Sequence, residues 1–364
     1  MRRTELERKD NFRGSHAREE QTMKNQIRSL VVLCAAVCLT LGVFTMQTVS
    51  AEAAWKPEKP VNLVVPWGAG GATDGVSRQT AMVLEGHLGQ KIVIVNQPGA
   101  SGSVGTKNVL DTPKEGLYWT AGAVKDLGVY KVQGLLDTTL DDWHLFLNFA
   151  IPNVVAVNAD SPYKDFGELL EGFKANPGKI KVATAGVNSA GHTAIEMIKS
   201  YTDIDYKHVS YEGGNPAVIA TVAGECDVVP QLAKEEVDML KAGKLRALAV
   251  LADAPLTIEG YDQEIPSVKK WIPDFVTAPI YFGIFVPKGV PEEAVATLTD
   301  IWNKSLVNDE GLKTFASQNA MIFDPATGDA AMKKAFPMVQ LDAWLKFDSG
   351  DAAIDPSTVG IPRP

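Results

Sequence analysis

The chain has 364 residues, of which 45% are hydrophobic and 22% are charged, a composition typical of a folded globular protein. This length suits two domains of roughly 100 to 200 residues each. The formal net charge is −9, and no basic run with interleaved aromatic side chains follows the first 53 residues. Nucleic acid is therefore a poor candidate partner, and an anion would be captured only where local amides overcome the negative field of the whole chain.

The N-terminal region has the pattern of an export signal. Lys24 and Arg28 precede an apolar run over residues 30–44, which is about as long as the hydrophobic part of a signal peptide and too short to span a bilayer. Small residues follow, so cleavage is expected near Ala51 or Ala53. The sequence therefore predicts a periplasmic protein.

Residues 1–53 are accordingly assigned to an N-terminal extension and signal peptide. The charged segment 1–22 lies upstream of a second methionine, Met23. It is either a mis-assigned start of translation or an unusually long leader, and the sequence leaves both readings open.

The first strand of the exported part leads into a glycine-rich loop. The β-branched run 61–65 predicts a buried strand, which Pro66 ends because proline cannot donate to a sheet. Three glycines within 68–71 leave the loop without side chains, and Thr73 or Asp74 is expected to cap the following helix. A strand, a glycine loop and a helix N-terminus together favour an anion site, because unpaired amides and the helix dipole meet there.

The same arrangement recurs along the chain. A strand at 91–95 leads into the glycine- and serine-rich segment 96–105, and a third strand is expected at 117–121. Strands that alternate with helices favour a mostly parallel sheet, in which ligands bind at the carboxyl ends of the strands. A second unit begins with a strand at 154–157, followed by a helix at 166–175 that Asp165 or Ser161 caps.

Two further loops of small residues follow strands in this second unit, at 184–192 and 210–216. The chain then returns through a long aromatic strand at 278–286 and a helix at 292–303. Residues 309–348 are interpreted as further helix.

Four segments in this order resemble one known family. They are Val65–Asp74, Asn96–Gly105, Ala183–Ser189 and Tyr211–Gly214. Together with the signal peptide, they resemble the extracytoplasmic receptors of tripartite tricarboxylate transporters, the Bug-type solute-binding proteins. The resemblance extends from Trp55 to about Trp344.

The resemblance implies an α/β fold of the type II periplasmic-binding-protein class, with two α/β lobes, a central ligand cleft and crossover hinge strands. Lobe 1 is expected to comprise residues 54–152 and 283–364, and lobe 2 residues 153–282. The implied ligand is a small carboxylate, either a di- or tricarboxylate or an aromatic or amino acid. The implied partner is a set of membrane transporter subunits or, alternatively, a sensor kinase. No cofactor or metal is expected, and the receptor is expected to be a monomer.

The expected ligand contacts are backbone amides of two loops, the first lobe loop (residues 67–74) and the second lobe loop (residues 185–193). Hydroxyl donors are expected beside them. The segment 124–126 departs from the family pattern, which usually has small hydroxyl residues there, so the identity of the ligand stays open. The predicted ligand-binding residues are Trp67, Gly68, Ala69, Gly70, Gly71, Ala72, Thr73, Asp74, Ser101, Ser103, Lys125, Ala185, Gly186, Asn188, Ser189, Ala190, Gly191, His192, Thr193, Glu212 and Gly213.

Several of these residues have a competing structural role. Asp74 serves as a helix cap or faces the ligand, and Trp67 stacks on the ligand or only forms the wall of the cleft. His192 donates to a carboxylate, or caps and packs at the helix start. Lys125 pairs with a distal carboxylate of the ligand, or is a solvated surface lysine.

A secreted hydrolase that uses Ser189 and His192 is the rival class. Such an enzyme needs a nucleophile, a nearby base and a third orienting group. The sequence contains no Gly-x-Ser-x-Gly elbow and no paired His or Cys spacing typical of a metal site. A non-enzymatic binding protein is therefore predicted.

Overall fold

The computed structural model describes Met23 and residues 55–364. The predicted signal peptide and its cleavage sites lie outside the described residues. No helix within the described part of the chain is long and apolar enough to cross a membrane.

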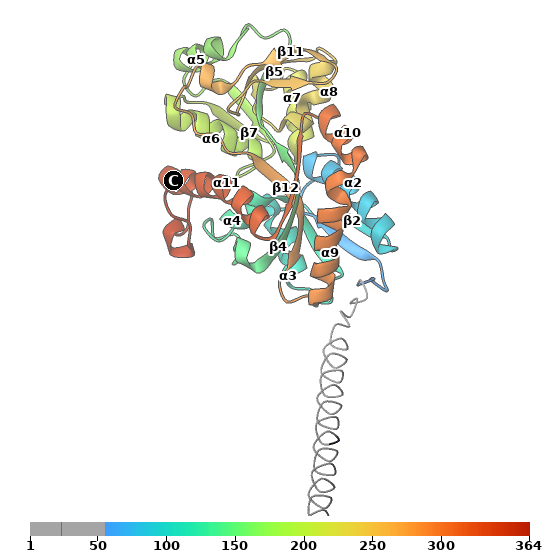
Figure 1. Ribbon diagram of the computed structural model, residues 1–364. Helices are drawn as coiled ribbons and strands as arrows, with labels where there is room; N and C mark the ends of the chain where they lie inside the picture. The colour runs from blue at the N-terminus through green and yellow to red at the C-terminus, as the bar shows by residue number, and fades with distance from the viewer. Residues whose placement is uncertain (1–22, 24–54) are drawn as a thin grey trace, which may run out of the picture. The chain divides into compact units, whose positions relative to one another are not determined.

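A six-stranded mixed sheet forms the lower lobe in Figure 1, with the strand order β13-β4-β12-β3-β1-β2. The β1–β2 and β1–β3 pairs are parallel, while the β3–β12, β12–β4 and β4–β13 pairs are antiparallel. The strands are β1 (Val61–Val65), β2 (Ile92–Asn96), β3 (Tyr118–Ala123), β4 (Trp143–Ile151), β12 (Ile280–Pro287) and β13 (Ile322–Thr327). The helices are α2 (Ala72–Leu88), α3 (Ser103–Leu110), α4 (Val124–Val129), α9 (Glu292–Lys304), α10 (Glu310–Gln318) and α11 (Gly328–Ser349).

A five-stranded sheet forms the other lobe, with the order β7-β6-β8-β5-β9. Its strands are β5 (Val154–Asn158), β6 (Lys181–Thr184), β7 (Lys207–Ser210), β8 (Val228–Val229) and β9 (Leu245–Val250). Its helices are α5 (Phe166–Ala175), α6 (Ala190–Thr202), α7 (Gly214–Val222) and α8 (Ala233–Lys241), and a hairpin of β10 (Leu256–Ile258) and β11 (Tyr261–Ile265) follows. The chain enters this lobe after β4 and returns through β12, so two crossings connect the lobes (Figure 1).

The predicted two-lobe α/β fold is confirmed, but several local predictions were wrong. The sheets are mixed rather than mostly parallel, and 143–151 is an almost wholly buried strand that the sequence analysis did not assign. The helix expected over 309–348 is interrupted by β13, an edge strand that contains Pro325. Proline is tolerated at a sheet edge but weakens the sequence signal for a strand. The lobe boundaries at 152/153 and 282/283 stay a prediction.

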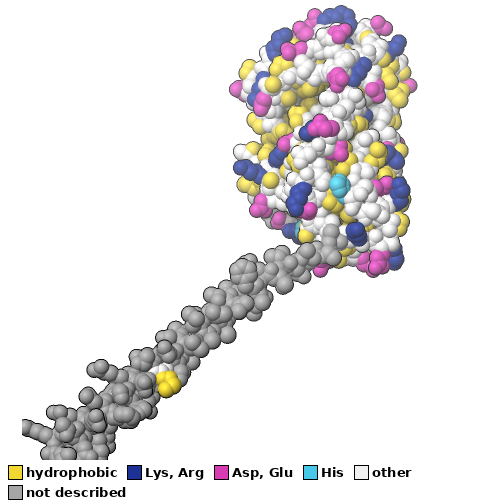
Figure 2. Space-filling model, turned by 45° about the vertical axis from the view of Figure 1, so that its right-hand side comes forward, with side chains coloured by type: hydrophobic (Ala, Val, Ile, Leu, Met, Phe, Trp, Pro, Cys, Tyr) yellow, Lys and Arg dark blue, Asp and Glu magenta, His cyan; other side chains and the backbone are white. Residues whose placement is uncertain are grey.

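The surface gives no sign of a nucleic-acid footprint on the face that Figure 2 shows. Lysine and arginine side chains there are interspersed with aspartate and glutamate rather than gathered into one stripe (Figure 2). A nucleic-acid site would present a basic patch.

Candidate ligand-binding cleft

The first and second lobe loops face each other across an inner cavity of about 40 Å³. Both lobes contribute small residues to its wall, so main-chain atoms come close to the space. Nine of the predicted residues line it, namely Trp67, Gly68, Gly71, Ala72, Thr73, Ala185, Ser189, Ala190 and Gly213.

A larger cavity of about 470 Å³, which we call the mouth, adjoins the inner one. The two share Trp67, Gly68, Ala185 and Gly213 in their walls. The mouth adds three more predicted residues, Ser101, Gly186 and Glu212. The lobes approach closely here, since a Cβ added at Gly68 would lie 3.1 Å from the carbonyl oxygen of Glu212.

Three helix N-termini converge on the inner cavity. The helices α2 and α7 begin after Gly71 and Gly213, and neither of these N-cap glycines has a side chain that could cap its helix. The helix α6 begins after Ser189, whose hydroxyl accepts a hydrogen bond from the main-chain nitrogen of His192. The positive ends of helix dipoles from both lobes therefore meet in one place, which favours an anion.

Asp74 does not cap α2, contrary to one expectation, but holds the loop before it. Its carboxylate accepts from the amide of Gly70 at 3.0 Å, from Arg78 Nε at 2.9 Å and from Asn96 Nδ2 at 3.1 Å. These bonds and the Arg78 charge outweigh the effect of burial and lower the pKa of Asp74. Asp74 lines neither cavity and, with its charge already paired, fixes the shape of the loop.

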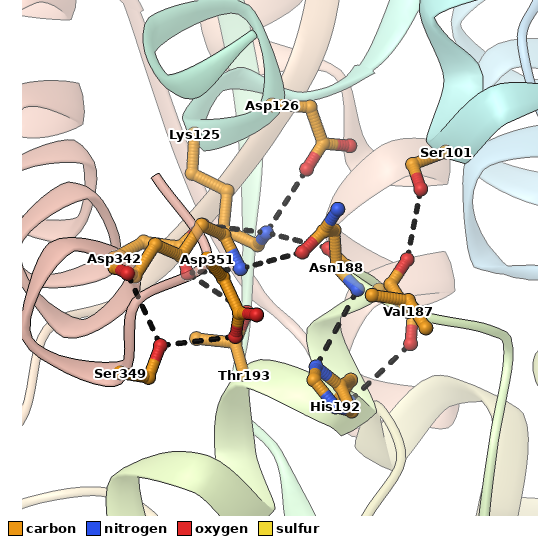
Figure 3. Close-up of polar contacts among 12 residues, drawn as sticks. Ser101, Lys125, Asp126, Val187, Asn188, His192, Thr193, Asp342, Ser349 and Asp351 are labelled. Atoms are coloured by element: carbon orange, nitrogen blue, oxygen red, sulfur yellow. Dashed lines mark hydrogen bonds and ion pairs between the residues drawn. The ribbon is translucent and has the colours of Figure 1, made fainter. Parts of the chain in front are cut away.

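Lys125 lies in a buried ion network and lines neither cavity. Its ammonium lies 3.0 Å from Asp126 Oδ1 and 3.0 Å from Asp342 Oδ2, and it donates to the carbonyl oxygen of Asn188 at 3.2 Å (Figure 3). Burial opposes its charge, but the two carboxylates raise its pKa. It is not the solvated lysine that was considered, and a direct contact with ligand stays a prediction.

The same network holds the second lobe loop. Asn188 has the left-handed backbone angle φ 68°, and its side-chain oxygen accepts from Lys346 Nζ at 2.9 Å. Asp342 also accepts from the hydroxyl of Thr193 at 3.0 Å, and Ser101 Oγ donates to the carbonyl oxygen of Val187 at 2.8 Å (Figure 3). Lys125, Lys346 and Ser101 of lobe 1 thus position the second lobe loop.

Other predicted donors already have partners within the protein. Ser103 Oγ donates to the carbonyl oxygen of Ala100, and Thr193 is bound to Asp342 as above. Nδ1 of His192 accepts from the amide of Asn188 at 3.5 Å, while burial and the neighbouring His208 lower the pKa of His192 to about 4. His192 is therefore neutral at pH 7. Its ring is bonded to the amide of Asn188, whereas the Ser189 hydroxyl is bonded to the main-chain nitrogen of His192.

The sequence analysis missed several polar residues of the inner cavity. Asp126, Gln231 and Glu235 all line it. Asp126 lies in the segment that departs from the family pattern, which was a usable signal. Glu235 sits within a charged helical stretch that looks like an ordinary solvated face, and nothing in its spacing marks it. The remaining predicted residues, Ala69, Gly70 and Gly191, line neither cavity.

Two α/β lobes with a cleft between them define the class of type II periplasmic binding proteins. A model of the tripartite tricarboxylate transporter family receptors, TctC, matches residues 76–340. The chain therefore belongs to this family, which is one of receptors that bind solutes.

Known relatives cover most of the chain. It is 30% identical over 257 residues to a Pseudomonas sp. (strain P51) protein encoded between tcbD and tcbE, an alignment that covers 69% of this chain and 74% of the relative. The periplasmic binding protein BugD has a similar structure, with a TM-score of 0.72 at 25% identity over 81% of this chain and 99% of BugD. MatC from Rhodopseudomonas palustris, solved with bound malate, has a TM-score of 0.69 at 23% identity over 81% of this chain and 99% of MatC.

Proposed function

We propose that the chain is an exported periplasmic receptor that captures a small carboxylate in the cleft and delivers it to the membrane subunits of a tripartite tricarboxylate transporter. The observation that carries this proposal is the convergence of three helix N-termini, contributed by both lobes, on one cavity. Membership of the receptor family and the malate bound to MatC support it.

The main chain supplies the donors in this proposal. A carboxylate that enters the cleft loses water, and it needs hydrogen bonds in return. Charge-assisted bonds to amides contribute about 1.5–3 kcal/mol each, so a few of them, reduced by the cost of closure, account for an affinity near micromolar, or about −8 kcal/mol. The amides of Gly71 and Ala190, both in the wall of the inner cavity, are the proposed donors.

The proposal is tested with the exported protein purified from its host periplasm. We expect carboxylates of two to ten carbons to raise its melting temperature, and calorimetry to give saturable binding with one site. A broad carboxylate panel that produced neither heat nor a shift would remove the binding function. Uptake of the labelled ligand in a deletion strain then separates a transport partner from a sensor kinase, because loss of uptake is expected only for transport.

A further inference from the structure

The inner cavity is acidic, although it belongs to a site proposed for an anion. Asp126 and Glu235 both line it, and no lysine, arginine or histidine is among the described residues in its wall. The nearest buried cation, Lys125, is already paired with Asp126 and Asp342. A second negative charge on a ligand would therefore face carboxyl groups rather than a cation.

Glu235 reaches across the cleft from α8 to the start of α2. Its Oε1 accepts a hydrogen bond from the amide of Ala72 at 3.2 Å. Its other oxygen lies against the N-terminus of α7, where a Cβ added at Gly214 would be only 1.9 Å from Oε2. The carboxyl of Glu235 thus occupies the position between two helix N-termini that an anionic ligand group would otherwise take.

Two buried polar atoms beside the cavity have no partner among the described residues. They are Oε2 of Glu235, an acceptor, and Nε2 of Gln231, a donor. Gln231 is only 1% exposed, and both residues line the cavity. Buried polar groups are nearly always hydrogen-bonded, so the pair points to a ligand that brings both a donor and an acceptor.

We propose that Glu235 determines specificity in this cleft, selecting carboxylates that also carry an ammonium group over those that carry a second negative or a neutral group in its place. The ammonium donates to Oε2 of Glu235 and is attracted by Asp126, while Nε2 of Gln231 and the amides at the start of α6 bind the ligand carboxylate. This inference rests on the proposed function, whose ligand class it narrows to amino acids.

The physical basis is the cost of an unpaired or like charge in a closed site. In its ionised form the buried Glu235 carboxylate attracts an opposite charge and repels a like one, and solvent does not screen it there. A hydroxyl in place of the ammonium donates a hydrogen bond but brings no charge. A site built around a hydrogen-bonding ligand group also discriminates strongly against analogues that lack it.

The test compares ligands that differ only in this group. Calorimetric titration of the exported protein with aspartate and malate, and with alanine and lactate, compares ammonium with hydroxyl on the same carbon skeleton. We expect the amino member of at least one pair to bind at least tenfold more tightly. In the Glu235→Gln variant we expect this preference to fall to less than threefold, because the charge is lost while the shape is kept.

Glu236→Gln is the matched control. Glu236 is the next residue of α8, is also buried, and does not line either cavity. We expect this variant to keep the wild-type preference, with circular dichroism verifying the fold of both variants.

Equal or tighter binding of the hydroxy acids by the wild type, or an unchanged preference in Glu235→Gln, would overturn the inference and leave the proposed function standing. Absence of binding by every carboxylate, with or without an ammonium, would overturn both.

Discussion

At the scale of single residues, Gly71 occupies the N-cap position of α2, where a side chain has little room. Its backbone angle φ is −72°, which any residue adopts, so the requirement is for space. A Cβ there would lie 3.3 Å from Glu235 Oε1 and 3.6 Å from the carbonyl oxygen of Gly68. We expect Gly71→Val to abolish the ligand-induced rise in melting temperature, because its methyl groups enter the inner cavity.

The control for Gly71→Val is Gly86→Val in the same helix, where an added Cβ meets nothing within 4 Å. This variant should keep the ligand-induced shift, and both should keep the wild-type circular dichroism. An unchanged affinity in Gly71→Val would remove the first loop from the site.

The raised pKa of Glu235 leads to a prediction for the stability of the fold. Burial, opposed mainly by the amide of Ala72, raises the pKa of Glu235 to about 7 from the ordinary value of 4.5. Between these values the ligand-free folded protein holds a proton that the unfolded chain has released, so stability falls as pH rises. Lys234 lowers this pKa, and Asp126 and Glu236 are the other charged groups nearby.

Glu235→Gln removes this titration. We therefore expect the variant to gain on the order of 2–3 kcal/mol in free energy of unfolding relative to wild type between pH 4 and pH 8. Urea denaturation at each pH measures the difference. A difference that stayed constant across this range would show that the pKa of Glu235 is the same in the folded and the unfolded chain.

At the scale of elements, one ion network joins α4, α6 and α11. Asp342 of α11 is fully buried and bound to Lys125 of α4 and Thr193 of α6. Burial works to raise the pKa of Asp342, but the charges of Lys125 and Lys346 outweigh it and lower the pKa to about 2. The stabilisation is present above pH 4 and is lost as pH falls towards 2, because the unfolded state then binds the proton first.

Asp342→Asn should therefore lower the free energy of unfolding at pH 7 by about 3–5 kcal/mol. The substitution removes the negative charge that pairs with the buried side chains of Lys125 and Lys346. Chemical denaturation measures this loss. The control is Asp348→Asn in the same helix, which removes an exposed pair with Arg363 and should cost less than about 1 kcal/mol. Equal losses in the two variants would contradict a special role for the buried network.

The sequence predicted the elements whose signals are local. The strand at 61–65 and its glycine loop were found because β-branched residues and glycines act on their own backbone. The strand β4 was missed because its mostly apolar sequence, interrupted by His144 and Asn148, does not alternate regularly, and its strand conformation is fixed by pairing with β12. Glu235 was missed for a similar reason, since its partner Ala72 lies 163 residues away in sequence.

At the scale of the whole molecule, the cleft is closed by contacts between the lobes that do not line the inner cavity. Asn215 Nδ2, at the start of α7, donates to the carbonyl oxygen of Gly70 at 2.7 Å in an exposed position. This bond exists only while the lobes are together. It therefore stabilises the closed state to the same extent whichever ligand is bound. The apparent affinity for any ligand depends on the population of that state.

We expect Asn215→Ala to weaken binding by roughly twofold to tenfold, the equivalent of one hydrogen bond of about 0.5–1.5 kcal/mol. Because the loss acts on closure, every ligand should be affected by the same factor, in contrast to Glu235→Gln, which should change the ratio between ligands. Calorimetry on the aspartate and malate pair measures both quantities. X-ray scattering should show a larger radius of gyration for the unliganded variant than for wild type. A ligand-dependent loss would instead place Asn215 in the binding site, and an unchanged affinity would mean that this contact does not contribute to closure.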